Sequence, residues 1–205
     1  MKNVIKTVAA AMLLLVGSQA FAQSFGAGYV NSTKTTGNST SSANGFYVGV
    51  NYKAEFAPGL SLNPGIYYEF LTSSNGANVG SIIAADATVQ EHYVNVPFHV
   101  SYAMNFAPTF KLFVYAGPTA NVGIASTTKT TVTSVIGGSS KSINNYDEGY
   151  NYSRFDVMLG GGIGAEVMNK IRVNVGYDWG MLDRNTSDNA SLHRNRLTAG
   201  VAFVF

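Results

Sequence analysis

Apolar and polar residues alternate with a period of two in eight stretches of this chain. Successive side chains of a β-strand point to opposite faces, so this period predicts strands with one apolar and one polar face. Most of the stretches reach the roughly nine to eleven residues that a tilted strand needs to cross a bilayer. The first is short, and its glycines make its limits uncertain. The predicted strands cover residues 25–30, 46–56, 60–71, 92–104, 110–124, 155–167, 171–182 and 197–205.

The connections between these strands alternate in length. Residues 57–59, 105–109 and 168–170 form short turns, whereas the segments 31–45, 72–88, 126–152 and 184–192 are long and polar. Short periplasmic turns and long extracellular loops are typical of outer-membrane barrels. The pattern predicts an all-β fold, an eight-stranded antiparallel transmembrane β-barrel with both termini on the periplasmic side.

The two strand faces differ in chemistry. One parity is apolar, and in a membrane barrel it faces lipid while the charged parity faces the lumen; a soluble barrel has the reverse arrangement. Parity alone does not distinguish the two, but the loop asymmetry and the chain ends favour the membrane arrangement. The predicted lumen charge network consists of Lys53, Glu55, Glu69, Glu91, His99, Lys111, Arg154, Asp156, Glu166, Arg172, Asp178 and Arg196.

The beginning of the chain has the features of a secretory signal peptide. Lys2 and Lys6 precede a short apolar run over 8–16, and the small-residue site Ala20-Phe-Ala22 follows. These features predict cleavage between Ala22 and Gln23, which divides the chain into a signal peptide (1–22) and a barrel domain (23–205). The apolar run is too short to span a bilayer as a helix.

The last predicted strand ends in aromatic residues. Phe203 and Phe205 lie on its apolar parity, and a terminal aromatic on an alternating strand resembles the signal that the barrel-assembly machinery of Gram-negative outer membranes reads. We therefore expect this machinery to be a partner during biogenesis.

Composition removes several classes of function. The chain has 13 Lys and Arg, two of them in the signal peptide, against 11 Asp and Glu, so the mature protein is close to neutral and nothing indicates a nucleic-acid partner. It has no cysteine, which excludes a lipoprotein anchor, disulfides and thiolate metal sites. No motif predicts a cofactor or a metal ion.

Three segments resemble a known family. Val94-Asn-Val-Pro-Phe-His-Val-Ser-Tyr102, Phe113-Val-Tyr-Ala-Gly-Pro118 and Arg154-Phe-Asp-Val-Met-Leu-Gly-Gly-Gly-Ile-Gly-Ala-Glu166 are similar to the small outer-membrane β-barrel proteins common in Bacteroidetes, including PorT-like members. The resemblance covers about 46–205. It implies a fold and a location, integral in the outer membrane, but no activity.

The charged lumen has two interpretations. An eight-stranded barrel is just wide enough to be filled by side chains. Interleaved charges of both signs, such as Arg154 with Asp156 and Glu166 with Arg172, favour a paired plug. The alternative is a narrow, porin-like path for ions or small solutes. Gly160, Gly162 and Gly164 share the lumen parity, where they make room for bulky neighbours such as Tyr115 or Arg172.

A lipid-modifying enzyme is a further, less favoured alternative. Such barrels need a positioned serine, histidine and carboxylate. The chain has His92, His99 and His193, but no nucleophile motif accompanies them.

The long connections favour a role at the cell surface. Gly137-Gly138 is a hairpin signal between two polar runs, 127–136 and 139–145, so the strands can continue beyond the membrane as a ribbon with an open edge. Such an edge can capture a partner strand; a flexible loop without a partner is the alternative. We predict a non-enzymatic, monomeric barrel in contact with outer-membrane lipid, with a structural role or with a protein or glycan ligand at its loops.

Overall fold

The computed structural model describes residues 24–79, 83–134, 137–147, 152–185 and 191–205. The predicted signal peptide and the cleavage site at Ala22 and Gln23 lie outside the described residues. Within them, no helix is long and apolar enough to cross a membrane.

The described chain folds into ten antiparallel strands. The alternating pattern predicted one of them, β8, with its observed bounds, and most others run further than predicted. The strands are β1 (Ser24–Thr36), β2 (Ser39–Asn51), β3 (Ala54–Ala57), β4 (Leu60–Val79), β5 (Ile83–Ala107), β6 (Phe110–Ser134), β7 (Gly137–Asn144), β8 (Phe155–Val167), β9 (Ile171–Gly180) and β10 (Leu192–Val204).

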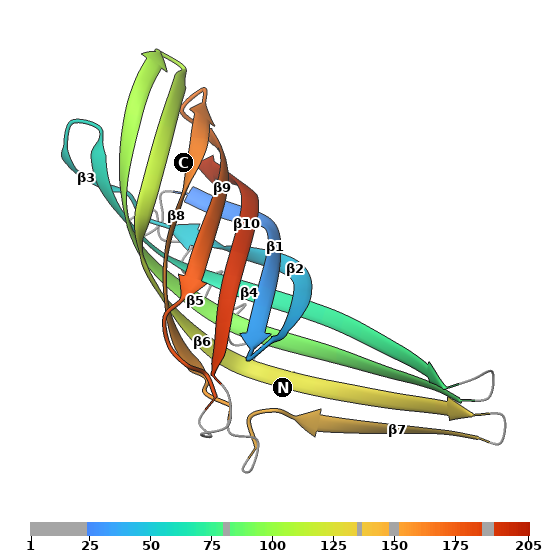
Figure 1. The fold of residues 1–205 in the computed structure, drawn as a ribbon. Coiled ribbons are helices and arrows are strands. Elements are labelled where there is room, and N and C mark those ends of the chain that lie inside the picture. The colour runs from blue at the N-terminus through green and yellow to red at the C-terminus, as the bar shows by residue number, and fades with distance from the viewer. Residues whose placement is uncertain (1–23, 80–82, 135–136, 148–151, 186–190) are drawn as a thin grey trace.

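Eight of these strands close into a ring, which confirms the predicted barrel. The hydrogen-bonded order is β2-β1-β10-β9-β8-β6-β5-β4, and pairing of β2 with β4 joins the ends (Figure 1). The short strand β3 pairs with β4 just beyond the end of β2, and β7 pairs with β6 outside the ring. The strand count therefore differs from eight because one wall strand is interrupted and one hairpin strand lies outside the wall.

The outer wall of the barrel is apolar and the lumen is polar. Phe46, Val175 and Trp179 expose about half of their side-chain surface, at 50%, 51% and 52%. By contrast, Glu69 and Asp156 are fully buried. Burial of charge together with exposure of large apolar side chains is the inverted arrangement of a membrane barrel.

The short turns occur where the sequence predicts them. At the β8–β9 turn, Met168 and Asn169 both have positive φ, at 55° and 56°, and the Lys170 N–H donates to the Val167 carbonyl at 3.1 Å. Positive φ at both central residues is the type I′ geometry, which matches the twist of the flanking strands. The β3–β4 turn likewise has Gly59 at φ 75°.

The long connections are more ordered than their composition predicts. Residues 31–45 belong to the paired strands β1 and β2, which turn at Gly37 with φ 55°. Most of 72–88 continues β4 and β5. The Gly137-Gly138 pair does not form the turn of its hairpin: Ser134 pairs with Gly137, so these glycines begin β7.

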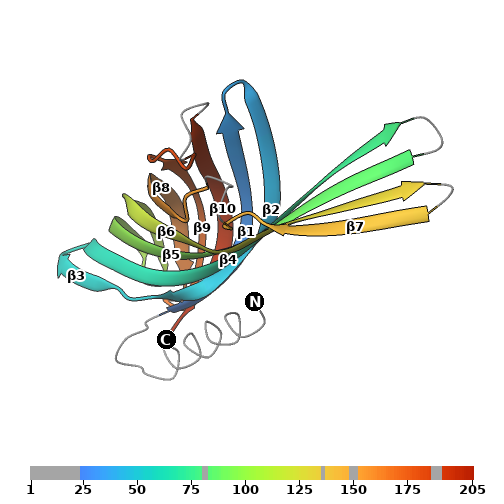
Figure 2. The same cartoon turned by 90° about the horizontal axis from the view of Figure 1, so that it is seen from below.

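The ends of β4–β7 form one sheet outside the barrel. It consists of residues 73–79 of β4, 83–89 of β5, 128–134 of β6 and β7, in that order (Figure 2). We call it the protruding sheet. Its strands continue those of the barrel wall, at the end of the barrel that carries the long connections.

Glycines on the lumen wall leave room for tyrosine rings. A Cβ added at Gly176 would lie 2.2 Å from the Tyr115 hydroxyl, and one at Gly162 would lie 2.5 Å from it. A Cβ added at Gly28 would lie 2.7 Å from Tyr47 Cε1, and one added at Gly200 would overlap the Tyr47 hydroxyl. Of the three lumen glycines predicted from the sequence, Gly162 lies against Tyr115, Gly160 against Asp178 and Gly164 against Phe113.

Candidate functional site

Charged side chains fill the barrel at three levels along its axis. At the level nearest the short turns, Glu166 lies between two cations. Arg172 Nε donates to its Oε2 at 2.6 Å, and Lys111 Nζ donates to its Oε1 at 3.2 Å. Arg172 and Glu166 are direct neighbours across β8 and β9, so the tight turn brings this pair together.

The middle level is a buried chain of two arginines and two acids. Arg196 donates to Asp178 Oδ2 at 2.7 Å and to Glu69 Oε2 at 2.9 Å. Arg194 forms an ion pair with the other oxygen of Glu69 and lies 4.1 Å above the Tyr93 ring. Buried charges need this degree of pairing, because each loses its hydration on folding.

The level nearest the long connections combines one ion pair with tyrosines. Lys34 Nζ contacts Glu91 at 2.5 Å, and the Tyr93 hydroxyl donates to Glu91 at 3.0 Å. Arg184 is fully buried, lies 4.5 Å from the Tyr152 ring centroid, and donates to the Tyr93 hydroxyl at 3.2 Å. Tyr93 therefore joins this level to the middle one.

Outside the barrel, the Asp183 carboxylate stabilises the connection between β9 and β10 through backbone hydrogen bonds. Asp183 Oδ1 accepts the backbone N–H groups of Leu192 at 2.8 Å and Asn185 at 2.9 Å. These hydrogen bonds stabilise the charged form and lower the pKa of Asp183.

Three residues of the predicted network lie elsewhere or pair differently. Arg154 is exposed, where it donates to the Gly123 and Ile124 carbonyls and lies 4.2 Å from the Tyr146 ring, so its predicted pairing with Asp156 is corrected. Asp156 is buried, forms no ion pair with any described residue, and accepts the Leu182 N–H at 3.3 Å.

Glu55 is the third of these residues. It belongs to β3, where the register with β4 shifts between Glu55 and Ala57, and its side chain is 52% exposed. Its contact with Lys53 is long, at 3.7 Å. The interruption after β2 removes Glu55 from the regular alternation.

Three network cations escaped the sequence reasoning: Lys34, Arg184 and Arg194. The first predicted strand ended at residue 30 and the last began at residue 197, whereas β1 reaches Thr36 and β10 begins at Leu192. Extending the parity of Arg196 by two residues would have found Arg194. Arg184 lies in the connection after β9, where no alternating pattern indicates that its side chain is buried.

The histidines have ordinary packing partners. His92 Nδ1 contacts the Tyr68 hydroxyl at 2.5 Å, and His99 stacks on Tyr115 with its Nε2 3.2 Å from Thr119 Oγ1. In the part of the chain that the structure describes, neither imidazole bonds to a serine. The same part holds no group of three or more His, Asp or Glu placed to bind a metal ion.

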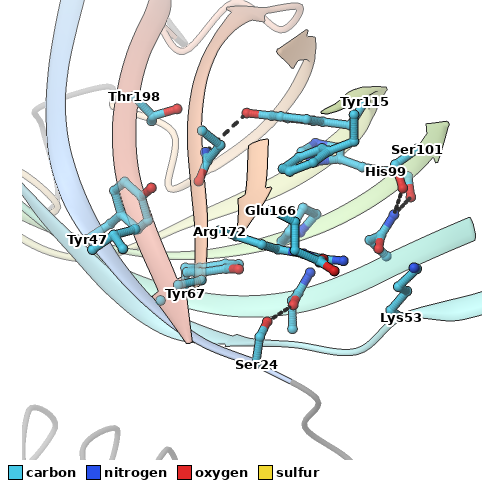
Figure 3. A pocket seen from close by; sticks show the side chains of 18 of the residues that line it. Ser24, Tyr47, Lys53, Tyr67, His99, Ser101, Tyr115, Glu166, Arg172 and Thr198 are labelled. Atoms are coloured by element: carbon cyan, nitrogen blue, oxygen red, sulfur yellow. Dashed lines mark hydrogen bonds and ion pairs between the residues drawn. The ribbon is translucent and has the colours of Figure 1, made fainter. Parts of the chain in front are cut away.

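A cavity occupies the short-turn half of the lumen. Its volume is about 1160 Å³, counting its open mouth. Figure 3 shows Lys53, Tyr67, Glu166 and Arg172 around one space, with His99 and Tyr115 on another wall. The cavity ends at the middle level, since Asp178 and Arg196 also line it.

The protruding sheet has two open edges within the described residues. Beyond Thr72, β4 pairs with β5 alone, and β7 pairs with β6 alone. Each edge therefore presents a row of backbone donors and acceptors that a further strand can use.

The fold and the lumen define an integral membrane β-barrel. The chain belongs to the family described as outer membrane protein beta-barrel domain, whose model matches residues 17–184. This confirms the predicted family and places the barrel in the outer membrane, with short periplasmic turns and long extracellular connections. The narrower resemblance to PorT-like members stays a prediction.

Among solved structures, the chain is similar to three outer-membrane proteins. The attachment invasion locus protein Ail of Yersinia pestis, in complex with the heparin analogue sucrose octasulfate, is 15% identical, with 89% of this chain and 97% of that chain covered and a TM-score of 0.43. Neisserial surface protein A is 13% identical, with 89% and 96% covered and a TM-score of 0.49. The outer membrane enzyme PagL is 11% identical, with 87% and 99% covered and a TM-score of 0.44. No curated protein matches the sequence.

Proposed function

We propose that this protein is a monomeric, non-enzymatic outer-membrane barrel that acts at the cell surface through its protruding sheet. The observation that carries the proposal is the pair of open strand edges, on β4 and β7, in the sheet that extends beyond the barrel (Figure 2). The partner we favour is an extended protein segment that adds to one edge as a further strand, with main-chain hydrogen bonds supplying affinity. A glycan ligand is the alternative partner.

The composition of the β7 edge supports strand addition. Ser139, Ser140 and Ser142 are small and exposed, so they leave the backbone accessible to an incoming strand. Lys141 is the charge on this edge, and charged side chains are a common protection of edges in soluble proteins. An edge with one lysine is only lightly protected.

The proposal is tested by binding of extended peptides to the purified barrel in lipid nanodiscs. The probe is an array of polar ten-residue peptides with high β-propensity. A variant that replaces residues 128–143 with a two-residue Asn-Gly turn removes the distal β6–β7 hairpin, and we expect it to lose at least about tenfold in affinity, which is roughly 1.4 kcal/mol.

A double substitution, Ser139→Lys and Ser142→Lys, blocks the edge without shortening it and should weaken binding in the same direction. Lys129→Gln, on the neighbouring strand β6, is the matched control that leaves the edge intact. Equal binding of all four proteins would reject strand addition at β7.

A narrow channel is the second candidate function, and the periplasmic cavity favours it. Charged side chains line part of the cavity wall and the cavity is partly open, as a solute path requires. The buried ion pairs of the middle level lie across that path, which is why we rank the channel below the surface role.

We further propose that the barrel-assembly machinery inserts the protein and reads Phe203 and Phe205. Both rings are exposed on the outer wall at the end of β10, and their centroids lie 5.7 Å apart. An accessible aromatic pair at the last strand is what such recognition requires.

A further inference from the structure

Charge is balanced at two of the three lumen levels and not at the third. The middle level has Arg194 and Arg196 with Glu69 and Asp178. The level nearest the long connections has Lys34 and Arg184 with Glu91 and with Asp156, which is buried near Arg184 and forms no ion pair within the described residues. The level nearest the short turns, on the periplasmic side, has three cations around a single carboxylate, Glu166. The cations are Lys53, Lys111 and Arg172.

Lys53 is the least neutralised of these cations. Among the described residues, its one ion pair is the 3.7 Å contact with Glu55, whose side chain is half exposed to solvent, whereas Lys53 itself is mostly covered. Lys111 and Arg172 share the two oxygens of Glu166. A partly buried cluster with excess positive charge is unfavourable when empty, and a bound anion relieves it.

The walls of the cavity suit an organic molecule better than a bare ion. Tyr47, Tyr67 and Tyr115 contribute ring faces and hydroxyl groups, and Asn63 and Asn174 contribute amides. Ligand sites commonly combine aromatic walls with a few positioned polar groups.

We propose that the periplasmic half of the lumen binds a small organic anion that enters from the periplasm. Its carboxylate or phosphate group lies among Lys53, Lys111 and Arg172, and its uncharged body lies against the tyrosine rings. The filled middle level stops the ligand from passing to the extracellular side. This site is separate from the protruding sheet and does not depend on the surface function.

The test is isothermal titration calorimetry on the mature protein in nanodiscs of zwitterionic lipid at low ionic strength, since salt screens such contacts. The probes are glucuronate, glucose 6-phosphate and uncharged glucose. We expect at least one of the two anions to bind about tenfold or more tightly than glucose. Binding of one anion alone would support the site and identify its charged group.

Two variants locate the site. Lys53→Gln should weaken anion binding about five- to tenfold and leave the weak glucose binding unchanged, because it removes one charge next to the anion. Lys53 makes no short ion pair, so this variant keeps the heat-modifiable gel mobility of the folded barrel. Lys111→Gln should act in the same direction.

Lys141→Gln is the matched control, because it removes one exposed lysine on the protruding sheet. The proposal is overturned if neither anion binds more tightly than glucose to the folded wild type. It is equally overturned if Lys141→Gln weakens binding as much as Lys53→Gln, because the effect would then reflect net charge and not this cavity.

Discussion

A charged side chain can be buried in the lumen only where hydrogen-bond and ion-pair partners surround it. Arg194 is fully buried, yet each part of its guanidinium has a partner: Glu69, Ser32 Oγ at 2.7 Å and Asn121 Oδ1 at 3.3 Å. Arg154 has the same strand parity as Asp156 but is exposed, and it donates to two backbone carbonyls. Because only Arg194 is buried, its removal should cost more folding stability than the removal of Arg154.

Arg194→Met should therefore destabilise the barrel by about 3 kcal/mol, at the lower end of the cost of breaking a buried pair, because Arg196 still neutralises Glu69. Arg154→Met is the control and should cost about 1 kcal/mol or less. Urea unfolding of the reconstituted protein, followed by tryptophan fluorescence, measures both. Equal losses would contradict the assignment of Arg194 to the network and of Arg154 to the surface.

At the scale of strands, exposed apolar residues meet different surroundings on the barrel wall and in the protruding sheet. Val175 of β9 lies on the apolar outer wall, whereas Val132 of β6 lies in the protruding sheet, and both are exposed, at 51% and 38%. Lipid surrounds the first and water the second. The identity of the solvent, not the exposure, sets what each position tolerates.

Val175→Arg should cost roughly 2–4 kcal/mol, the penalty for a cation near the middle of the bilayer. Val132→Arg should have little effect on the same measurement, since its charge stays in water. The free energy of unfolding in lipid vesicles tests the pair. If the two substitutions were equally costly, the membrane would not lie at the level of Val175.

For the whole molecule, the lumen is open at one end and filled at the other. The periplasmic cavity stops at Arg196, and Tyr93 links the middle level to Arg184 above it. The lumen is therefore open toward the periplasm and filled toward the protruding sheet.

Wild-type protein in planar bilayers should accordingly show no steady conductance. Arg194→Ala combined with Glu69→Ala removes one buried ion pair from the middle level, which lies across the path, and should produce measurable openings. Lys141→Ala should leave the bilayer current at the wild-type level. A large, ion-selective current through the wild type would instead favour the channel function.

The alternating pattern was sufficient to predict the barrel, its eight wall strands and its short turns. A period of two follows directly from strand geometry, and the contrast between faces is strongest where one face meets lipid. In β8, from Phe155 to Val167, this contrast extends over the whole strand, and its predicted bounds equal the observed ones.

The Gly137-Gly138 signal predicted the β6–β7 hairpin as a ribbon beyond the membrane, although the turn lies before these glycines. The ends of β4 and β5 could not be predicted as part of the same sheet, because both of their faces meet water and no contrast marks them. Tertiary structure also decided the partners in the lumen. Whether Arg196 bonds to Asp178 or Glu69, and whether Arg194 joins them, depends on strand register and barrel closure. Parity assigns a charge to the lumen, but only the closed ring brings residues more than 100 positions apart, such as Glu69 and Arg196, within bonding distance.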